Sequence, residues 1–402
     1  MLKNLSIKVI IFGFIFTFFS SFGQSFFLGL FNESIRNELD ITHGQFGSIY
    51  ASATLLSSII LIWVGKKIDD FDVLKFSFFV ISLLAISTFT FSKINSITFL
   101  FIAILLMRFS GQGMMSHTAT TTVSRYFTKS RGRALSICWF GLSSAEFILP
   151  VLMVFLLSLT TWQNIWTVIA LLILIFLPIA SFFLVRTVKL DTRESTEGEE
   201  LKEENIKQWK RIEVIKDYKF YIVSMNMLAM PWIATGVFVY QSFITESKNW
   251  GPFVIAQSFM SYSVFSVITL LISGFLIDKF TSRKLLIFMN IPLFLSTFVI
   301  IYFDAQFTAF IFLGLIGISN GLANVLGSST WAEVYGVKHI GSIKALTTAL
   351  MVFSTAFGTA LFGILIDIGF SIEKIAIISA LYILISFILL FLVRKKLNPI
   401  LV

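Results

Sequence analysis

Twelve apolar stretches, each long enough to cross a lipid bilayer as a helix, follow one another along the 402-residue chain. A helix needs roughly 20 apolar residues to span about 30 Å of hydrocarbon. The chain is 56% hydrophobic and only 13% charged, whereas soluble proteins carry about a quarter charged residues. We therefore expect an all-α membrane protein with twelve transmembrane helices. The expected spans are residues 7–30, 44–64, 75–92, 97–121, 134–158, 163–185, 219–242, 253–277, 285–302, 307–330, 345–367 and 372–393.

The formal charge of +9 needs an explanation, because a basic chain can also be a nucleic-acid binder. With the N-terminus inside, the short inner loops and ends contain 17 basic residues, and the outer loops contain four, Arg36, Lys93, Lys248 and Lys374. Cytoplasmic loops are enriched in Lys and Arg, so both termini are predicted to be cytoplasmic. The expected surroundings are a lipid bilayer, with no nucleic acid, and the short loops favour a bacterial inner membrane. The 17 inner residues are Lys3, Lys8, Lys66, Lys67, Lys75, Arg125, Lys129, Arg131, Arg133, Lys279, Arg283, Lys284, Lys338, Lys344, Arg394, Lys395 and Lys396.

An internal repeat divides the spans into two sets of six. Residues 65–75 align with residues 274–284 at an offset of 209, and the same offset pairs Tyr126 with Tyr335. Two separate loops in one register indicate a duplication. The segment between the sets has nearly balanced charge and is expected to be a flexible or loosely helical linker. The predicted domains are an N-terminal six-helix bundle (1–186), a cytoplasmic linker (187–217) and a C-terminal six-helix bundle (218–402).

The repeated loops carry the pattern Gly-x-x-x-Asp, from Gly65 to Asp69 and from Gly274 to Asp278. This pattern resembles the signature of the major facilitator superfamily, and the resemblance covers essentially the whole chain. The family pattern continues with a basic residue, a glycine and a basic pair. Both copies depart from it, the first with Asp70 where a basic residue is usual. Conformational interlocking in the first half is therefore expected to use other partners.

Two further segments strengthen the resemblance. Residues 108–113, Arg-Phe-Ser-Gly-Gln-Gly, resemble the family's Arg-x-x-x-Gly-x-Gly element in the fourth span, with the glycines displaced by one position. Residues 331–336, Trp-Ala-Glu-Val-Tyr-Gly, are similar to the junction of the tenth and eleventh spans in the monocarboxylate and oxalate/formate-like branch. That branch often places basic residues deep in the eighth and eleventh spans, and here those positions hold none. The resemblance implies two bundles that expose one central site alternately, lined by spans one, four, seven and ten.

Two charged residues lie deep in predicted spans, Arg108 in the fourth and Glu146 in the fifth. Either charge alone costs several kcal/mol in hydrocarbon, so a charge pair or a wet cavity is expected. A guanidinium stays charged and matches a carboxylate, which suits Arg108 to an anionic substrate group or to proton coupling. Glu146 is the candidate carrier of the coupling proton. The alternative is a structural ion pair between the two.

Polar side chains at helical spacing mark further candidates for the substrate or proton site. Arg108 and Gln112 lie four residues apart, Gln24 lies four after Ser20, and Asn320 and Asn324 form a third pair. His117, near the inner end of the fourth span, can titrate near neutral pH. Each also fits the alternative of a side chain that only bonds or packs between helices.

The repeated loops supply the candidate gating residues. An aspartate beside the inner face can cap a helix end or pair with a basic residue and so hold one closed state. The alternative is an ordinary solvated loop charge. The gating set is Gly65, Asp69, Gly274, Asp278, Arg131 and Arg133.

Motifs of other functional classes do not occur in the sequence. It contains no H-E-x-x-H, no G-x-S-x-G and no phosphate-binding loop, so neither an enzyme nor a pump driven by ATP is expected, and no cofactor or metal is expected. The prediction is a monomeric secondary transporter of a small solute, with a proton as coupling ion and a small organic anion such as a monocarboxylate taken up by symport. Proton-driven efflux of amphiphilic compounds is one alternative, and a receptor or scaffold that transports nothing is another.

Overall fold

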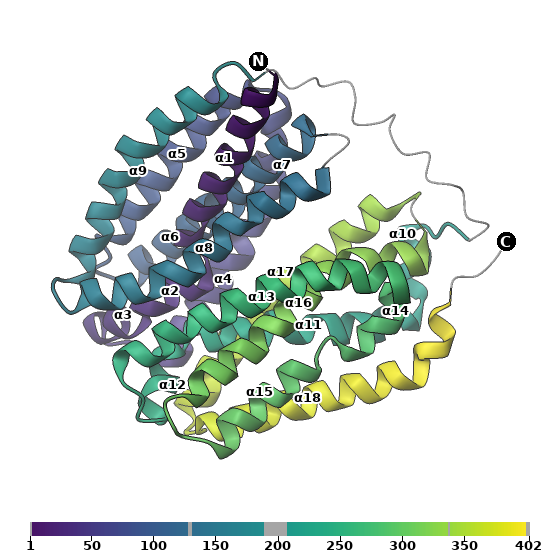
Figure 1. Cartoon of the computed structure of the whole chain (residues 1–402). Coiled ribbons are helices and arrows are strands. Elements are labelled where there is room, and N and C mark those ends of the chain that lie inside the picture. The colour runs from purple at the N-terminus through teal and green to yellow at the C-terminus, as the bar shows by residue number, and fades with distance from the viewer. Residues whose placement is uncertain (1, 128–130, 189–206, 337, 399–402) are drawn as a thin grey trace. The chain divides into compact units, whose positions relative to one another are not determined.

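The computed structural model describes residues 2–127, 131–188, 207–336 and 338–398 (Figure 1). Within these ranges the regular structure is helical, and no strand occurs. Twelve helical segments of the described chain are long and apolar enough to cross a membrane, so the predicted all-α fold is confirmed. These spans are Leu5–Gly23, His43–Ile68, Val73–Phe91, Ile97–Tyr126, Arg133–Leu157, Trp162–Val185, Tyr218–Val239, Pro252–Ile277, Ser282–Tyr302, Thr308–Tyr335, Ser342–Asp367 and Ile372–Leu397.

The chain forms two compact units, divided between Glu199 and Glu200 inside the segment expected to be the linker. The first unit contains α1 (Leu2–Ser20), η1 (Ser21–Gly23), α2 (Ser25–Leu28), η2 (Gly29–Phe31), α3 (Asn32–Leu39), α4 (His43–Val64), η3 (Gly65–Asp69), α5 (Val73–Phe91), α6 (Ile97–Met107), η4 (Arg108–Met115), α7 (Ser116–Tyr126), α8 (Arg131–Leu157) and α9 (Trp162–Val185). The second contains α10 (Arg211–Lys216), α11 (Tyr218–Val239), α12 (Gln241–Ser247), α13 (Pro252–Phe280), α14 (Ser282–Leu285), η5 (Leu286–Phe288), α15 (Ile291–Tyr302), α16 (Thr308–Tyr335), α17 (Ile340–Asp367), α18 (Ile372–Val393) and η6 (Arg394–Leu397).

The helices of each unit pair in the same way. The first span packs against the fifth, the third against the sixth and the second against the fourth. In the first unit these pairs are α1 with α8, α5 with α9 and α4 with α6, and in the second they are α11 with α17, α15 with α18 and α13 with α16. Because the repeat was inferred from loop residues alone, this shared packing of the helices supports the duplication independently.

Small residues let the first and fifth spans approach closely in both units. A Cβ atom at Gly141 on α8 would overlap the carbonyl oxygen of Phe14 on α1. In the second unit a Cβ at Gly358 on α17 would overlap the carbonyl oxygen of Trp232 on α11. Lipid provides no hydrophobic force between helices, so membrane proteins depend on such close contacts for packing.

Two predicted spans differ from the structure. The first, expected as one run over residues 7–30, ends as an α-helix at Ser20, so the continuous helix is wrong. The ninth, expected over residues 285–302, starts as the short helices α14 and η5 and becomes a longer α-helix only at Ile291. Pro292 lies in the first turn of that helix, where its missing N–H costs nothing.

Part of the predicted linker is ordered against the second unit. Residues 189–206 lie outside the described ranges, and residues 211–216 form α10. Val214 on α10 is fully buried, in a cluster that includes Leu326 and Trp331 of α16 and Leu390 of α18. This end of the linker is therefore a fixed part of the second unit.

Candidate functional site

The first span is broken at a place where its backbone meets the fourth span. After η1, Gln24 adopts an extended conformation (φ −84°, ψ 153°), and the chain restarts as α2. A Cβ at Gly23 would lie within 2.9 Å of the Cα atom of Gly111 on η4, so only glycine fits this contact. A break in a membrane helix frees backbone carbonyls to bind other groups, which is how many transporters build their sites.

The fourth span is irregular at the same place. Residues Arg108–Met115 form a π-helix between the α-helical segments α6 and α7. A π-helix is rare, and where it interrupts an α-helix it often marks a functional site. Two irregular backbones therefore lie against each other within the first unit.

Arg108 joins these two backbones and the second span. Its Nη1 donates hydrogen bonds to the carbonyl oxygen of Gly23 at 3.0 Å and to Oγ of Ser25 at 3.3 Å. The guanidinium carbon lies 5.3 Å from the centre of the Tyr50 ring, and Tyr50 Oη donates to Ser25 Oγ at 3.0 Å. Arg108 is only 2% exposed, and its Nε has no hydrogen-bond partner in the described part of the chain. Neutral groups alone therefore bind this buried cation, and one of its donors is unused.

Glu146 lies near the middle of α8, in the same unit, and is 8% exposed. The described residues provide it with no ion pair or hydrogen bond. In particular, it does not pair with Arg108, so the alternative of a structural Arg108–Glu146 ion pair is not what this structure contains. Pro150 lies inside α8, which is one continuous helix from Arg131 to Leu157.

The other polar candidates fall into two groups. Gln24 and Gln112 are half-buried and lie at the helix break and on the π-helix, beside Arg108 in the fold. Asn320 donates from Nδ2 to Oγ of Ser266 on α13 at 2.9 Å, which is the interhelical bond of the alternative reading. Asn324 is exposed on α16.

His117 fits the packing alternative in this structure. Its Nε2 lies 3.0 Å from the carbonyl oxygen of Gly65, at the start of η3. The imidazole thus connects α7, the last part of the fourth span, to the loop after the second. This contact engages one of the two ring nitrogens.

The structure describes only part of the predicted gating set. The side chains of Asp69, Asp278 and Arg131 lie outside the description, and Arg133 is exposed. Gly65 is buried against His117, whereas a Cβ at Gly274 would meet nothing within 4 Å. The gating roles remain predictions.

Glu333 forms a contact with the repeated loop that sequence reasoning missed. Its carboxylate accepts hydrogen bonds from the backbone N–H groups of Ser282 at 2.8 Å and Arg283 at 3.2 Å, and lies 3.3 Å from Nε of Arg283. It therefore caps α14, in the repeated loop, from the end of α16. A carboxylate at the end of an apolar span, opposite a basic loop, was the available signal.

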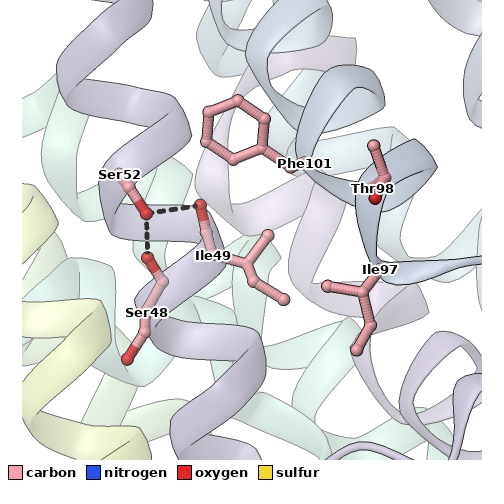
Figure 2. A pocket seen from close by; sticks show the side chains of 6 residues that line it. All are labelled: Ser48, Ile49, Ser52, Ile97, Thr98 and Phe101. Atoms are coloured by element: carbon pink, nitrogen blue, oxygen red, sulfur yellow. Dashed lines mark hydrogen bonds between the residues drawn. The ribbon is translucent and has the colours of Figure 1, made fainter.

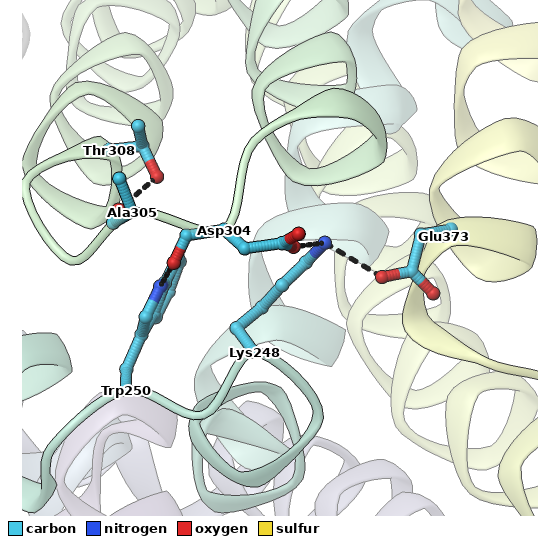
Figure 3. Close-up of polar contacts among 6 residues, drawn as sticks. All are labelled: Lys248, Trp250, Asp304, Ala305, Thr308 and Glu373. Atoms are coloured by element: carbon cyan, nitrogen blue, oxygen red, sulfur yellow. Dashed lines mark hydrogen bonds and ion pairs between the residues drawn. The ribbon is translucent and has the colours of Figure 1, made fainter.

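Lys248 forms a second cluster that the sequence did not reveal, at the opposite end of the second unit's spans (Figure 3). Its Nζ lies 2.7 Å from Asp304 and 2.7 Å from Glu373, and its side chain is 2% exposed. Trp250 Nε1 donates to the carbonyl oxygen of Asp304 at 2.7 Å. Burial alone would lower the pKa of Lys248, but the hydrogen bonds to Asp304 and Glu373 raise it above its ordinary value. One cation thus joins the end of α12, the loop after α15 and the first turn of α18.

A separate pocket of about 410 Å³ lies between α4 and α6 in the first unit (Figure 2). Its polar lining is Ser48, Ser52 and Thr98, and Ser52 Oγ already donates to the carbonyl oxygens of Ser48 and Ile49. No charged side chain lines it, and Arg108 and Glu146 do not contribute. It offers no group that would bind an ion.

Comparison with known proteins agrees with the fold. The sequence model of the Major Facilitator Superfamily matches this chain twice, over residues 13–240 and 221–400. A bacterial homolog of the human lysosomal transporter Spinster is similar in structure, at TM-score 0.70 in its unoccupied and 0.71 in its occupied inward-facing form, with 13% identity over 98% of this chain and 97% of that one. The nucleoside transporter NupG has a TM-score of 0.70 with 15% identity, over 98% and 99% of the two chains.

No curated protein matches the sequence. The family match nonetheless covers nearly the whole chain, and the solved structures share its fold. The chain therefore belongs to the major facilitator superfamily, as a multi-pass membrane protein and secondary transporter of a small solute rather than an enzyme.

Proposed function

We propose that this transporter takes up a small organic anion, such as a monocarboxylate, together with a proton. The observation that carries the proposal is the pair of buried, unneutralised charges in the first unit: Arg108, held by neutral oxygens with Nε unused, and Glu146, without a partner. The sequence resemblance of residues 331–336 to the monocarboxylate and oxalate/formate-like branch favours the same substrate class.

Charge balance explains why two unpaired groups suit this reaction. A buried ion is costly in hydrocarbon unless a partner or water compensates it. A substrate carboxylate on Arg108 would neutralise the cation, and a proton on Glu146 would neutralise the anion. A permanent ion pair between the two residues would make both compensations unnecessary and would leave nothing for the substrate and proton to do.

The helix break and the π-helix supply the means of coupling. Arg108 bonds to the Gly23 carbonyl and to Ser25, on either side of the break at Gln24. A carboxylate is a stronger acceptor for a guanidinium than a carbonyl or hydroxyl group. Substrate binding would therefore compete for the donors that hold the first span, and Gln24 and Gln112 are placed to contribute side-chain amides. Asn320, Asn324 and His117 are not needed for this role.

Further parts of the proposal concern the setting of the protein. We place it in a bacterial inner membrane with both termini in the cytoplasm, because of the excess of basic residues in the inner loops. Asp69 and Asp278, together with Arg131 and Arg133, would act as gates at the inner face. The functional unit would be a monomer.

Transport by the purified protein in vesicles tests the proposal. Labelled lactate should accumulate when the outside is acidic, and collapse of the pH gradient should stop accumulation. Glu146→Gln should abolish the response to the gradient, whereas Glu33→Gln, an exposed carboxylate of the same unit, should retain it. Efflux of a hydrophobic dye without lactate uptake would instead support the export of amphiphiles. If Glu146→Gln kept full proton-driven uptake, Glu146 would not carry the proton.

A further inference from the structure

One surface of the second unit combines exposed basic side chains, exposed apolar side chains and a backbone fixed by contacts with the rest of the unit. It consists of five exposed side chains on and beside α10, which we call the α10 face: Lys210, Arg211, Ile212, Ile215 and Lys216. Ile212 is 66% exposed. In a helix, residues three and four apart lie on one side, so Ile212 lies beside both Ile215 and Lys216. Val214 points the other way, into the core.

The α10 face is held rigidly by contacts on both of its flanks. Before α10, the backbone N–H of Trp209 donates to the carbonyl oxygen of Tyr335 at 3.0 Å, and Gln208 Oε1 accepts from the backbone N–H of Lys338 at 3.0 Å. After α10, the Tyr335 hydroxyl donates to Asp217 Oδ2 at 3.1 Å. A surface fixed in this way loses little conformational freedom when it binds.

The salt bridges beside α10 leave three of its basic side chains outside any ion pair between described residues. Lys207 pairs with Glu213 at 3.0 Å, and Lys219 pairs with Asp217 at 3.4 Å. The hydrogen bond from the backbone N–H of Lys210, followed by the one from Lys207, lowers the pKa of Glu213, so this carboxylate stays charged and occupied. In the described part of the chain Arg211 and Lys216 have no acidic partner, and Lys210, whose charge acts on Glu213, forms no salt bridge.

The α10 face lies next to the start of a membrane span, and this position determines its surroundings. Only Asp217 separates α10 from α11, the seventh membrane span, which starts at Tyr218. Tyr218 and Tyr221 are more than half exposed at that end. Tyrosines of this kind are enriched at the level of lipid headgroups, where a ring finds both apolar and wet surroundings. The α10 face therefore lies at the membrane interface.

We propose that the α10 face binds the headgroups of anionic phospholipids. Lys210, Arg211 and Lys216 would contact the phosphates, and Ile212 and Ile215 would enter the boundary between headgroups and acyl chains. Basic residues beside exposed apolar ones, on a helix parallel to the membrane, are the usual means of such binding. A juxtamembrane cluster of this kind recognises negative lipids more strongly with each added Lys or Arg.

Lipid titration of the full chain in detergent tests the proposal. Short-chain phosphatidylglycerol should raise the midpoint of thermal unfolding and slow hydrogen exchange in the peptide covering residues 207–219, and phosphatidylcholine at the same concentration should do neither. Each basic residue contributes roughly a fivefold difference in affinity. The triple variant Lys210→Gln, Arg211→Gln, Lys216→Gln should therefore bind phosphatidylglycerol roughly 100-fold more weakly.

A matched triple variant controls for net charge. Lys344→Gln, Lys395→Gln and Lys396→Gln remove three exposed basic residues from the same unit, and exchange in residues 207–219 should still respond to phosphatidylglycerol. The proposal is overturned if phosphatidylcholine or inorganic phosphate protects this peptide as well as phosphatidylglycerol does. It is also overturned if lipid has no effect but neutralising the chain's own acids Glu197, Glu199 and Glu200 exposes the peptide, because the linker itself would then occupy the surface.

Discussion

The two units share their helix packing and differ in where they keep their charges. At the repeat offset of 209, the positions of Arg108 and Glu146 in the first unit correspond to Gly317 and Thr355 in the second. The second unit instead holds its ion pairs at the ends of its spans, at Lys248 and at Glu333. Duplication therefore reproduced the scaffold, whereas charges deep within a membrane span belong to the first unit only, among the residues that the structure describes.

The difference extends to the backbone. The first and fourth spans of the second unit, α11 and α16, are uninterrupted α-helices of 22 and 28 residues. The fourth span of the first unit contains the π-helix, and its first span contains the break. Regular helices satisfy their own backbone groups, so they pack well but offer a solute little to bind. Irregularity and charge occur together in the first unit, which is why we place the solute site there.

The largest expected effect comes from removing the cation of the first unit. Arg108→Gln should reduce proton-driven uptake of labelled lactate roughly 100-fold, because a substrate carboxylate loses a charged partner. Arg186→Gln, which removes an exposed arginine of the same unit, should leave uptake within a factor of about two. Equal losses in the two variants would show that the position of the charge does not matter and would break the contrast between the units.

How much of this contrast the sequence could predict differs from feature to feature. The spans were predictable because hydropathy is a local property of about 20 residues, and the duplication because two loops kept their register. The depth of Arg108 and Glu146 followed from counting along a span. Their failure to pair did not, because pairing depends on side-chain direction in three dimensions.

Features that depend on distant contacts were missed. The polar residues around Gln24 did not by themselves indicate a break, because its cause includes the contact between Gly23 and Gly111, 88 positions apart. Lys248 was counted only as an outer-loop charge, since its burial depends on Asp304 in the loop after α15 and on Glu373 at the start of α18. A local sequence pattern predicts the secondary structure of a segment, but it does not predict which distant segments pack against it.

Two glycine substitutions test the close packing of α13 and α16 in the second unit. A Cβ at Gly317 on α16 would overlap the carbonyl oxygen of Tyr262 on α13, so Gly317→Ala should destabilise the protein by about 2 kcal/mol. Gly274→Ala, with nothing within 4 Å of the added Cβ, should be neutral or stabilising by about 0.5 kcal/mol. Unfolding in detergent measures both. Similar stabilities would argue against close packing at Gly317.

The Lys248 cluster predicts a smaller, pH-dependent loss. Lys248→Met should cost about 1 kcal/mol at pH 7, since Asp304 is largely exposed and Glu373 partly so. The pKa of Lys248 is raised above its ordinary value of 10.5, so its contribution is complete below pH 10.5 and disappears as the pH rises through the folded-state value. Unfolding of both proteins from pH 7 to 11 should show the difference shrinking only at the alkaline end. A difference that shrinks below pH 9 would contradict this assignment.

The smallest expected effect compares how the two units cap the repeated loop. In the first unit Asp72 Oδ1 accepts from the backbone N–H of Leu74 at 2.9 Å, a local cap at the start of α5. In the second unit Glu333 of another helix, α16, caps the start of α14. Asp72→Ala should cost about 0.5 kcal/mol and act only on α5, because a local cap ties nothing else to it.

Glu333→Ala removes two backbone bonds and an ion pair with Arg283 together, so it should cost about 1 kcal/mol and also loosen α14 from α16. Hydrogen exchange should accordingly rise in both α14 and the end of α16 for Glu333→Ala, and in α5 alone for Asp72→Ala. If Asp72→Ala disturbed α7 as strongly as Glu333→Ala disturbs α16, the first unit would contain a cross-helix contact at its inner end as well. The two units would then be closed by equivalent means, and the asymmetry between them would be confined to their buried charges.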